Sequence, residues 1–420
     1  MNSPLVRWRT VLLLAGIAFL AHFNRVSISV AGNEVFIGKG KLSTEQMGWV
    51  YSIFLLVYTI GMLPGGWLID RIGPRRALAG MGLGLGFWAA ATGALAWLGL
   101  SIAAMVVPLL LIRGLAGAAS VPLHPGAARA VSLWLPVQER STANGLVTAG
   151  AVVGIALCYP LFGFLIEWVG WPAAFGICGG VLFLYALLWY ALTSGAAAEP
   201  QRDLPHNDVR LRSLLALFRN RSLVLLTLSY GALSYVQYLY FYWIEFYFKN
   251  ELKVPIAESR KAAFTVTLAM ALGMFLGGTM ADRLARWLGQ SRSCRAIALT
   301  GMGLTALFSL AGITTADPRM VTAWFALSLG SLGLCEAIFW TTAPMLDRRG
   351  GLACALVNTG GNGVGMLAPV VTPILGAQFG WSWAIAAACL ICGLGGLLWL
   401  GIDADRHSNG PHQGPGVGGY

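Results

Sequence analysis

Two arginines lie inside long apolar stretches of the sequence, where a positive charge is costly. Arg25 lies in the first apolar stretch and Arg113 in the fourth. Insertion scales put a mid-span arginine at about +2.5–3.5 kcal/mol, so each should face a wet cavity or a partner. No mid-span acid lies nearby in the sequence, and the guanidinium fork suits a carboxylate or phosphate. We therefore expect an anionic ligand to neutralise them; snorkelling or capping of backbone carbonyls is the alternative.

Aromatic and amide side chains recur at helical spacing in other apolar stretches. Tyr235, Tyr238 and Tyr242 fall on one helical face, as do Asn358 and Asn362. Their polar groups could hydrogen-bond a polyhydroxylated ligand while the rings pack on its carbon skeleton. An interfacial aromatic belt is the alternative. The predicted ligand-binding residues are Arg25, Arg113, Tyr51, Tyr58, Tyr235, Tyr238, Tyr242, Trp340, Asn358 and Asn362.

Four titratable side chains are candidates for binding a coupling proton. Glu336 is the first, because a carboxylate in an apolar cavity can bind and release a proton near neutral pH; a structural hydrogen bond between helices is the alternative. Glu245 lies near the outer end of its stretch, where we expect a solvated surface charge. His22 and His124 can titrate, but we expect both to be hydrogen-bonded packing residues.

The elements that carry these side chains are expected to lie in lipid. Of 420 residues, 57% are hydrophobic and 11% are charged, about half the charged fraction of a soluble domain. Apolar stretches recur that are long enough to cross the hydrocarbon core, without the short alternation of a membrane barrel. The composition predicts an all-α membrane protein of twelve transmembrane helices. The predicted spans are 9–31, 47–68, 77–99, 102–124, 141–165, 171–193, 222–248, 258–280, 295–313, 319–344, 351–377 and 381–402.

The distribution of charge predicts the orientation. With the N-terminus inside, the cytoplasmic segments hold 19 Lys and Arg and the outer segments hold seven, as the positive-inside rule requires. This bias also explains the net charge of +11 without nucleic acid. Residues 194–221 are predicted to be a cytoplasmic linker between six-helix halves at 1–193 and 222–403, and residues 404–420 a disordered tail. The prediction is a multi-pass protein of the cell inner membrane with both termini cytoplasmic.

Several functional classes lack support in the sequence. The seven cysteines lie mostly in apolar stretches and give no disulfide framework or metal site. No nucleophile–base pair or phosphate-binding loop stands out, so we expect neither an enzyme nor a cofactor. No folded soluble domain is attached that would favour a receptor.

A short motif occurs in both halves at a fixed offset of 212 residues. In each copy two glycines are followed by Asp and Arg. Glycine lets helices approach closely, and Asp can pair with Arg or accept hydrogen bonds from a helix N-terminus. A single copy could be an ordinary charged turn. Two copies at corresponding places in the two halves favour a latch on the cytoplasmic side, which holds one conformation and breaks in another. The predicted gating-loop residues are Gly66, Asp70, Arg71, Arg75, Asp282 and Arg283.

The repeated motif resembles the signature loop of the major facilitator superfamily, whose fold is two six-helix bundles around a central cavity. Within it, the sequence resembles the anion:cation symporter family, which includes sugar-acid, hexuronate and organic-phosphate carriers. Four stretches carry this resemblance: 23–31; 113–115 with 120–125, Arg129, Trp134 and Pro136; 242–247; and 358–365 with Pro369.

The resemblance implies a secondary active transporter that takes up a small organic anion, such as a sugar acid or other carboxylate, by alternating access. It also implies that Arg25 and Arg113 line the substrate cavity. The family's usual acids are replaced here by Asn24 and Ser120, which leaves the coupling ion, proton or sodium, open. An exporter or antiporter of drugs or metabolites and an uncoupled anion facilitator or exchanger are the alternatives. The expected partners are the anion, the coupling ion and the lipid bilayer, and the expected state is a monomer.

Overall fold

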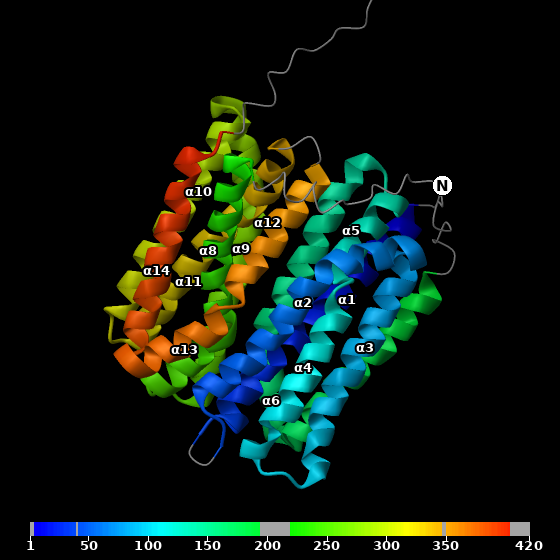
Figure 1. The fold of residues 1–420 in the computed structure, drawn as a ribbon, viewed down its shortest axis with the longest axis vertical. Coiled ribbons are helices and arrows are strands. Elements are labelled where there is room, and N and C mark those ends of the chain that lie inside the picture. Colours follow the sequence, from blue (N-terminus) through cyan, green and yellow to red (C-terminus); the bar gives the residue numbers. More distant parts are fainter. Residues whose placement is uncertain (1–3, 39–40, 194–218, 347–349, 404–420) are drawn as a thin grey trace, which may run out of the picture.

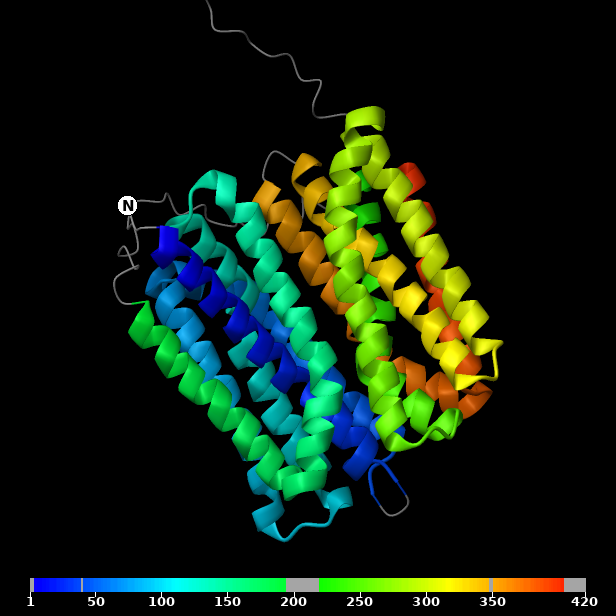
Figure 2. The same ribbon diagram turned by 180° about the vertical axis from the view of Figure 1, so that it is seen from behind.

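The computed structural model describes residues 4–38, 41–193, 219–346 and 350–403. Within these ranges the regular elements are helices. The first group is α1 (Pro4–Ala31), α2 (Thr44–Ile72), α3 (Pro74–Ala94), α4 (Val106–Ser120), α5 (Leu123–Trp134) and α6 (Val137–Leu192). The second group is α8 (Arg221–Phe246), α9 (Ile256–Leu288), α10 (Gln290–Ile313), α11 (Pro318–Thr342), α12 (Gly350–Gly365), α13 (Ala368–Phe379) and α14 (Trp381–Leu397). The two groups form two bundles that lie side by side (Figures 1 and 2).

Local sequence signals explain where several helices begin and end. Ser43 and Gln46 form a capping box at the start of α2, in which each side chain satisfies a backbone N–H of the other residue. Gly73, with φ 80°, separates α2 from α3, which begins at Pro74. Such a positive φ is open to glycine at little cost, and proline suits the first helical turn. Gly170 adopts φ 77° and ψ 158° inside α6 and divides that long element into two helices.

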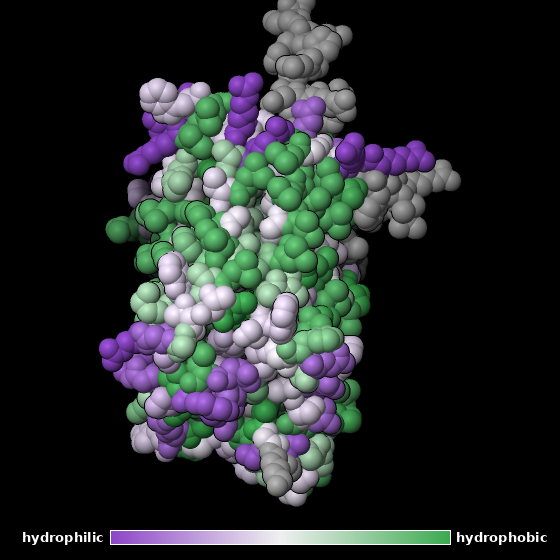
Figure 3. Space-filling view, turned by 90° about the vertical axis from the view of Figure 1, so that its left-hand side faces the viewer, coloured by the Kyte–Doolittle hydropathy of each residue, from purple (hydrophilic) through white to green (hydrophobic). Residues whose placement is uncertain are grey.

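The helices match the predicted membrane spans. Nine helical stretches within the described residues are long and apolar enough to cross a membrane, and the longest, Thr142–Leu192, contains the break at Gly170. Each predicted span falls on helical segments of the structure, which is consistent with twelve crossings. The space-filling view shows an apolar band between polar ends (Figure 3). Large apolar side chains are exposed on its lipid-facing helices, such as Leu390 at 64% and Leu307 at 58%.

The two bundles pack tightly where α2 begins. An added Cβ at Gly48 of α2 would clash with the carbonyl oxygen of Pro369 in α13, so only glycine allows this approach. The Ser52 hydroxyl donates to the Met366 carbonyl at 2.7 Å, and the Tyr159 hydroxyl of α6 donates to the Phe241 carbonyl of α8 at 2.9 Å. We call this the outer end, because it lies opposite the N-terminus (Figure 1), for which the charge bias predicts a cytoplasmic location.

The repeated motif differs from the predicted loops. Its residues belong to helices: α2 continues to Ile72 and α9 to Leu288, so Asp70 and Asp282 precede the helix ends. Each helix continues beyond its apolar span and ends before a glycine with positive φ, which is Gly73 after α2 and Gly289 after α9. The predicted linker falls mainly on 194–218, and the predicted tail is 404–420; both lie outside the described residues.

Candidate functional site

The two predicted arginines meet between α1 and α4. The Arg113 Nη2 atom donates to the Arg25 carbonyl oxygen at 2.9 Å. Both guanidinium groups lie over the ring of Phe54 in α2, with Arg25 at 5.4 Å and Arg113 at 4.6 Å from its centroid. Arg113 is only 5% exposed. The alternative of carbonyl capping therefore holds for one N–H of Arg113.

Two donors of these arginines have no hydrogen-bond partner among the described residues. Arg25 Nη2 and Arg113 Nε are buried and make no hydrogen bond. The ion pairs found among the described residues join other side chains, so neither arginine is locked against a carboxylate there. Since a buried charge is costly unless paired, the site is electrostatically incomplete.

Side chains of the second bundle complete the surroundings of Arg25. Its guanidinium carbon lies 5.1 Å from the ring centroid of Tyr238 in α8 and 5.9 Å from that of Tyr58 in α2. The hydroxyls of Tyr238 and Tyr242 are close enough to interact with its charge. The Tyr242 ring stacks on Tyr51 of α2 at 5.0 Å, and both hydroxyls are buried without a partner. The site thus lies between the bundles and retains free hydroxyl groups.

An amide chain on α12 extends this site. The Tyr238 hydroxyl donates to Asn362 Oδ1 at 2.6 Å, and Asn362 Nδ2 donates to the backbone oxygen and to Oδ1 of Asn358 at 2.9 and 3.0 Å. The structure therefore brings Arg25, Tyr238, Asn362 and Asn358 into one connected network. Tyr235 also has a buried, unpartnered hydroxyl, but no contact given for the described residues joins it to the arginines.

We predict that Tyr238→Phe weakens the binding of a small carboxylate about 5- to 160-fold, because Asn362 Oδ1 is left unsatisfied at about 1–3 kcal/mol. The ring over Arg25 remains. The dissociation constant of a small hydroxylated carboxylate from the purified protein measures the effect. Tyr240→Phe is the matched control: its buried hydroxyl shares a 2.8 Å hydrogen bond with Ser309, away from the arginines. That variant should lose stability and keep its dissociation constant; an unchanged dissociation constant in Tyr238→Phe would remove Tyr238 from the site.

Glu336 is held by a hydrogen-bonded network between α8 and α11. Its Oε1 accepts from the Tyr230 hydroxyl at 2.8 Å and from the Trp340 indole N–H at 3.2 Å. Its Oε2 is buried without a partner. The interhelical hydrogen bond considered for this residue is therefore present. Trp340, predicted to bind the ligand, has its N–H engaged by this carboxylate.

The other polar residues singled out in the first bundle make local contacts, although Asn24 Oδ1 is buried without a hydrogen-bond partner among the described residues. His22 and His124 pack edge to face at 5.2 Å, and His22 Nδ1 is 3.1 Å from the Ala18 carbonyl. The Asn24 amide donates to the Leu20 carbonyl at 2.9 Å, and the Ser120 hydroxyl to the Gly117 carbonyl at 2.8 Å. The two histidine rings thus pack on each other, and their packing role stays a prediction.

The prediction that Glu245 is a solvated surface charge is wrong. The residue is 3% exposed, and neither carboxyl oxygen has a hydrogen-bond partner. It lies beside an ion-pair cluster that the sequence analysis missed, in which Arg260 of α9 bridges Glu34 and Glu167. Glu34 lies in the π-helical turn η1 (Gly32–Phe36) that follows α1. The sequence does place Glu34 and Glu167 at the outer ends of spans in the first half and Arg260 at the outer end of a span in the second. These opposite charges could have predicted the ion pairs.

Among the predicted gating residues, Arg75 has contacts that the structure describes. Arg75 donates to the Tyr190 carbonyl and lies 3.9 Å from the Tyr190 ring centroid, within the first bundle. Asp282 and Arg283 are exposed, as is Arg71. The side-chain surroundings of Gly66 and Asp70 lie outside the described part of the chain. Their latch role stays a prediction.

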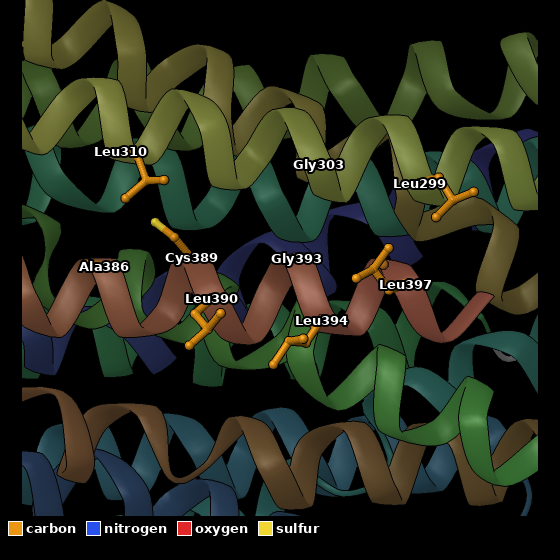
Figure 4. A pocket seen from close by; sticks show the side chains of 10 residues that line it. Leu299, Gly303, Leu310, Ala386, Cys389, Leu390, Gly393, Leu394 and Leu397 are labelled. Atoms are coloured by element: carbon orange, nitrogen blue, oxygen red, sulfur yellow. The ribbon is translucent and has the colours of Figure 1, made fainter. Parts of the chain in front are cut away.

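An apolar groove lies away from this site, between α10 and α14 (Figure 4). It encloses about 600 Å³. Its lining is Leu299, Gly303, Leu310, Ala386, Cys389, Leu390, Gly393, Leu394, Gly396 and Leu397. The lining contains no charged side chain, and the Cys389 thiol is its one polar group, so it lacks the donors that would bind an anion; Leu390, Leu394 and Leu397 are exposed there.

Long apolar helices in two bundles, with Arg25 and Arg113 buried where the bundles meet, define a multi-pass membrane protein. The family model "Major Facilitator Superfamily" matches residues 14–347, so the chain belongs to this superfamily of membrane transporters. It is a transporter and not an enzyme, as predicted.

Curated relatives and a solved structure agree with this assignment. The chain is 28% identical over 405 residues to "Probable galactarate/D-glucarate transporter GudP" of Bacillus subtilis, covering 88% of this chain and 85% of the relative. It is 29% identical to "Probable sulfoacetate transporter SauU" of Cupriavidus necator, covering 84% and 83%. It is 28% identical to "D-galactonate transporter" of Escherichia coli, covering 95% and 96%.

A bacterial homologue of the human lysosomal transporter Spinster, solved in an inward-facing and unoccupied conformation, has the same fold. Its TM-score is 0.77 at 16% identity, and the match covers 97% of this chain and 98% of that one. At this identity the likeness shows the fold alone, which confirms the predicted major facilitator architecture.

Proposed function

We propose that this protein takes up a small organic anion, of the sugar-acid or related carboxylate class, across the inner membrane by alternating access. The observation that carries the proposal is the pair Arg25 and Arg113, buried between the halves with free donors and no carboxylate partner in the described residues. A carboxylate bound there would supply the missing charge and accept from the guanidinium donors.

The remainder of the site suits a polyhydroxylated carbon chain. The free hydroxyls of Tyr51 and Tyr242 and the amide of Asn358 offer hydrogen bonds, while the rings of Phe54 and Tyr58 offer apolar faces. The curated relatives named for galactarate, glucarate and galactonate support a sugar acid. The relative named for sulfoacetate supports the wider class of small anions.

Alternating access accounts for the packing between the halves. The outer end is closed by the close approach of Gly48 to Pro369 and by the Arg260 ion pairs. In the proposed cycle the halves rock about the arginine site, and the Asp70 and Asp282 segments latch the cytoplasmic side.

Direction and substrate are tested together in membrane vesicles. Right-side-out vesicles should accumulate radiolabelled D-galactonate or D-glucarate, and inverted vesicles should not. Accumulation only in inverted vesicles would reverse the proposed direction and favour the exporter. No saturable movement of any sugar acid or sulfoacetate in either preparation would refute the anion class.

We propose that uptake is coupled to a cation, with Glu336 as a proton carrier. Glu336→Gln should abolish accumulation of D-galactonate against its gradient and spare counterflow, because Gln keeps the bonds from Tyr230 and Trp340 but cannot release a proton. Uptake into proteoliposomes with and without an inward proton gradient measures this. Glu258→Gln, which loses an exposed surface pair with Lys261, is the control. Full gradient dependence in Glu336→Gln would exclude Glu336 as carrier.

A further inference from the structure

Four charged residues at the outer end form what we call the outer cluster: Glu34, Glu167, Glu245 and Arg260. Arg260 Nε and Nη2 donate to the two Glu34 oxygens at 2.6 and 2.7 Å, and its Nη1 lies 2.8 Å from Glu167. The side chains of Arg260 and Glu34 are 7% and 6% exposed, whereas Glu167 is 56% exposed. All three nitrogens of the guanidinium group are thus engaged by carboxylates of the first bundle.

Glu245 is the member that this arrangement leaves unsatisfied. It follows Tyr242 by one helical turn in α8, and its carboxyl faces Glu34 and Asn33 of η1. Neither of its oxygens accepts a hydrogen bond. Its neighbours are the Asn33 amide, whose Nδ2 is likewise buried without a partner, and the Glu34 carboxylate. A second carboxylate can offer a hydrogen bond only if a proton lies between the two.

The other groups around Glu245 do not supply a counter-charge at its oxygens. The Lys249 ammonium donates to the Asn33 carbonyl at 2.8 Å, and the Asn250 amide to Asn33 Oδ1 at 3.0 Å. The Tyr159 hydroxyl donates to the Phe241 carbonyl at 2.9 Å. The remaining titratable neighbours, Tyr51 of α2 and Cys158 of α6, are neutral acids at physiological pH.

The local geometry favours a proton at this position. Arg260 directs its nitrogens to Glu34 and Glu167, Lys249 donates to the Asn33 carbonyl, and the nearby exposed Lys41 donates to the Val35 carbonyl. No cation therefore contacts the buried Glu245 oxygens, and an ionised Glu245 would place two carboxylates face to face. We propose that Glu245 binds a proton, and that this proton is required for the outer end of the transporter to close.

The positions of these residues on the two halves connect the proton with movement. Glu34 and Glu167 belong to the first bundle, while Glu245, Lys249 and Arg260 belong to the second. When the outer end opens, Arg260 leaves Glu34 and stays on the same bundle as Glu245. Glu245 then meets water and two cations of its own bundle, which stabilise the ionised form. Closure therefore takes up a proton, and opening releases it.

The outer cluster also lies next to the proposed anion site. The hydroxyls of Tyr51 and Tyr242 are unpartnered, and Tyr51 interacts electrostatically with both Glu245 and Arg113. A proton at Glu245 and an anion at Arg113 would therefore both change the electrostatic surroundings of the Tyr51 and Tyr242 hydroxyls. This link to transport rests on the proposed function, whereas the closure of the outer end does not.

The test is hydrogen–deuterium exchange of the full-length protein in detergent without substrate, at about pH 5.5 and about pH 8.5. Exchange of peptides spanning 29–37 and 245–262, corrected for the intrinsic pH dependence, reports opening of the outer end. In the wild type, opening should rise by up to about tenfold per pH unit over the range in which the proton dissociates. Glu245→Gln, a neutral isostere, should stay protected at both pH values.

Glu139→Gln is the control, since it neutralises a carboxylate that pairs with Arg7 at 3.2 Å, away from the outer cluster, and it should keep the wild-type pH response. Glu245→Asp, which retains a titratable group, should restore a pH response that Gln lacks. A wild-type pattern without pH dependence, or an unchanged dependence in Glu245→Gln, overturns the proposal. Because no anion is present, these outcomes are independent of whether D-galactonate is transported.

Discussion

Arg113→Ala should abolish D-galactonate uptake while the protein still inserts and folds. Removing one partner of a buried charged pair costs about 2–5 kcal/mol, which is about 30- to 5,000-fold in affinity. The variant also loses the bond to the Arg25 carbonyl, which orders α1 against α4. Equilibrium binding of radiolabelled D-galactonate to purified protein, together with uptake into proteoliposomes, measures the effect.

Two further variants isolate the anion-binding role of Arg113. Arg113→Lys keeps the charge but not the planar fork and should be intermediate. Arg140→Ala removes an arginine that caps the Leu135 and Ser132 carbonyls at 3.0 and 2.6 Å, far from the interbundle site in sequence and contacts. It should leave D-galactonate affinity unchanged. Wild-type affinity in Arg113→Ala would show that the arginine serves only to hold α1 in place.

Arg260→Ala should hold the transporter open at its outer end. The change leaves the buried Glu34 carboxylate unpaired, and breaking a buried pair costs about 3–5 kcal/mol. Since every cycle passes through the closed outer end, we expect uptake to fall at least about tenfold. Uptake into proteoliposomes and deuterium exchange of residues 29–37 measure the loss of activity and the opening.

The neighbouring Lys261 provides the control for this prediction. Its pair with Glu258 has side chains that are 71% and 58% exposed, and an exposed pair contributes only about 0–1 kcal/mol. Lys261→Ala should therefore transport normally. Glu34→Gln combined with Arg260→Ala removes the stranded carboxylate and should recover part of the closure. If the double variant were as open as Arg260→Ala, the ion pair would not be what closes the outer end.

Sequence patterning was sufficient for the fold because the membrane imposes one strong constraint. Each span must be apolar and helical, so the spans could be located without tertiary information. The same reasoning does not predict where helices end. At Gly170 two spans follow each other with almost no connection. At the end of α2 the helix continues past its apolar part to Ile72. Helix ends beyond the hydrocarbon depend on capping and on glycine conformations.

The candidate site was predictable at the positions where an isolated charge in an apolar stretch carries a large free-energy cost. Arg25 and Arg113 stand out against apolar neighbours, and the structure brings them together. The exposure of Glu245 was wrongly predicted because its burial depends on η1 folding over the end of α8. This contact joins the two halves through Glu34 and Glu245, which are 211 residues apart in the sequence. Pairings such as Arg260 with Glu34 are set by how the bundles dock, which no local pattern encodes.

The measurement that tests the central claim most directly compares the thermal stabilisation of wild-type protein by D-galactonate and by galactitol, which has a similar hydroxylated chain without the carboxylate. If the buried guanidinium groups take their counter-charge from the cargo, galactonate raises the melting temperature and galactitol does not, and Arg25→Gln and Arg113→Gln both lose the response. Equal stabilisation by the uncharged polyol, or a galactonate response that survives in Arg113→Gln, would contradict the account.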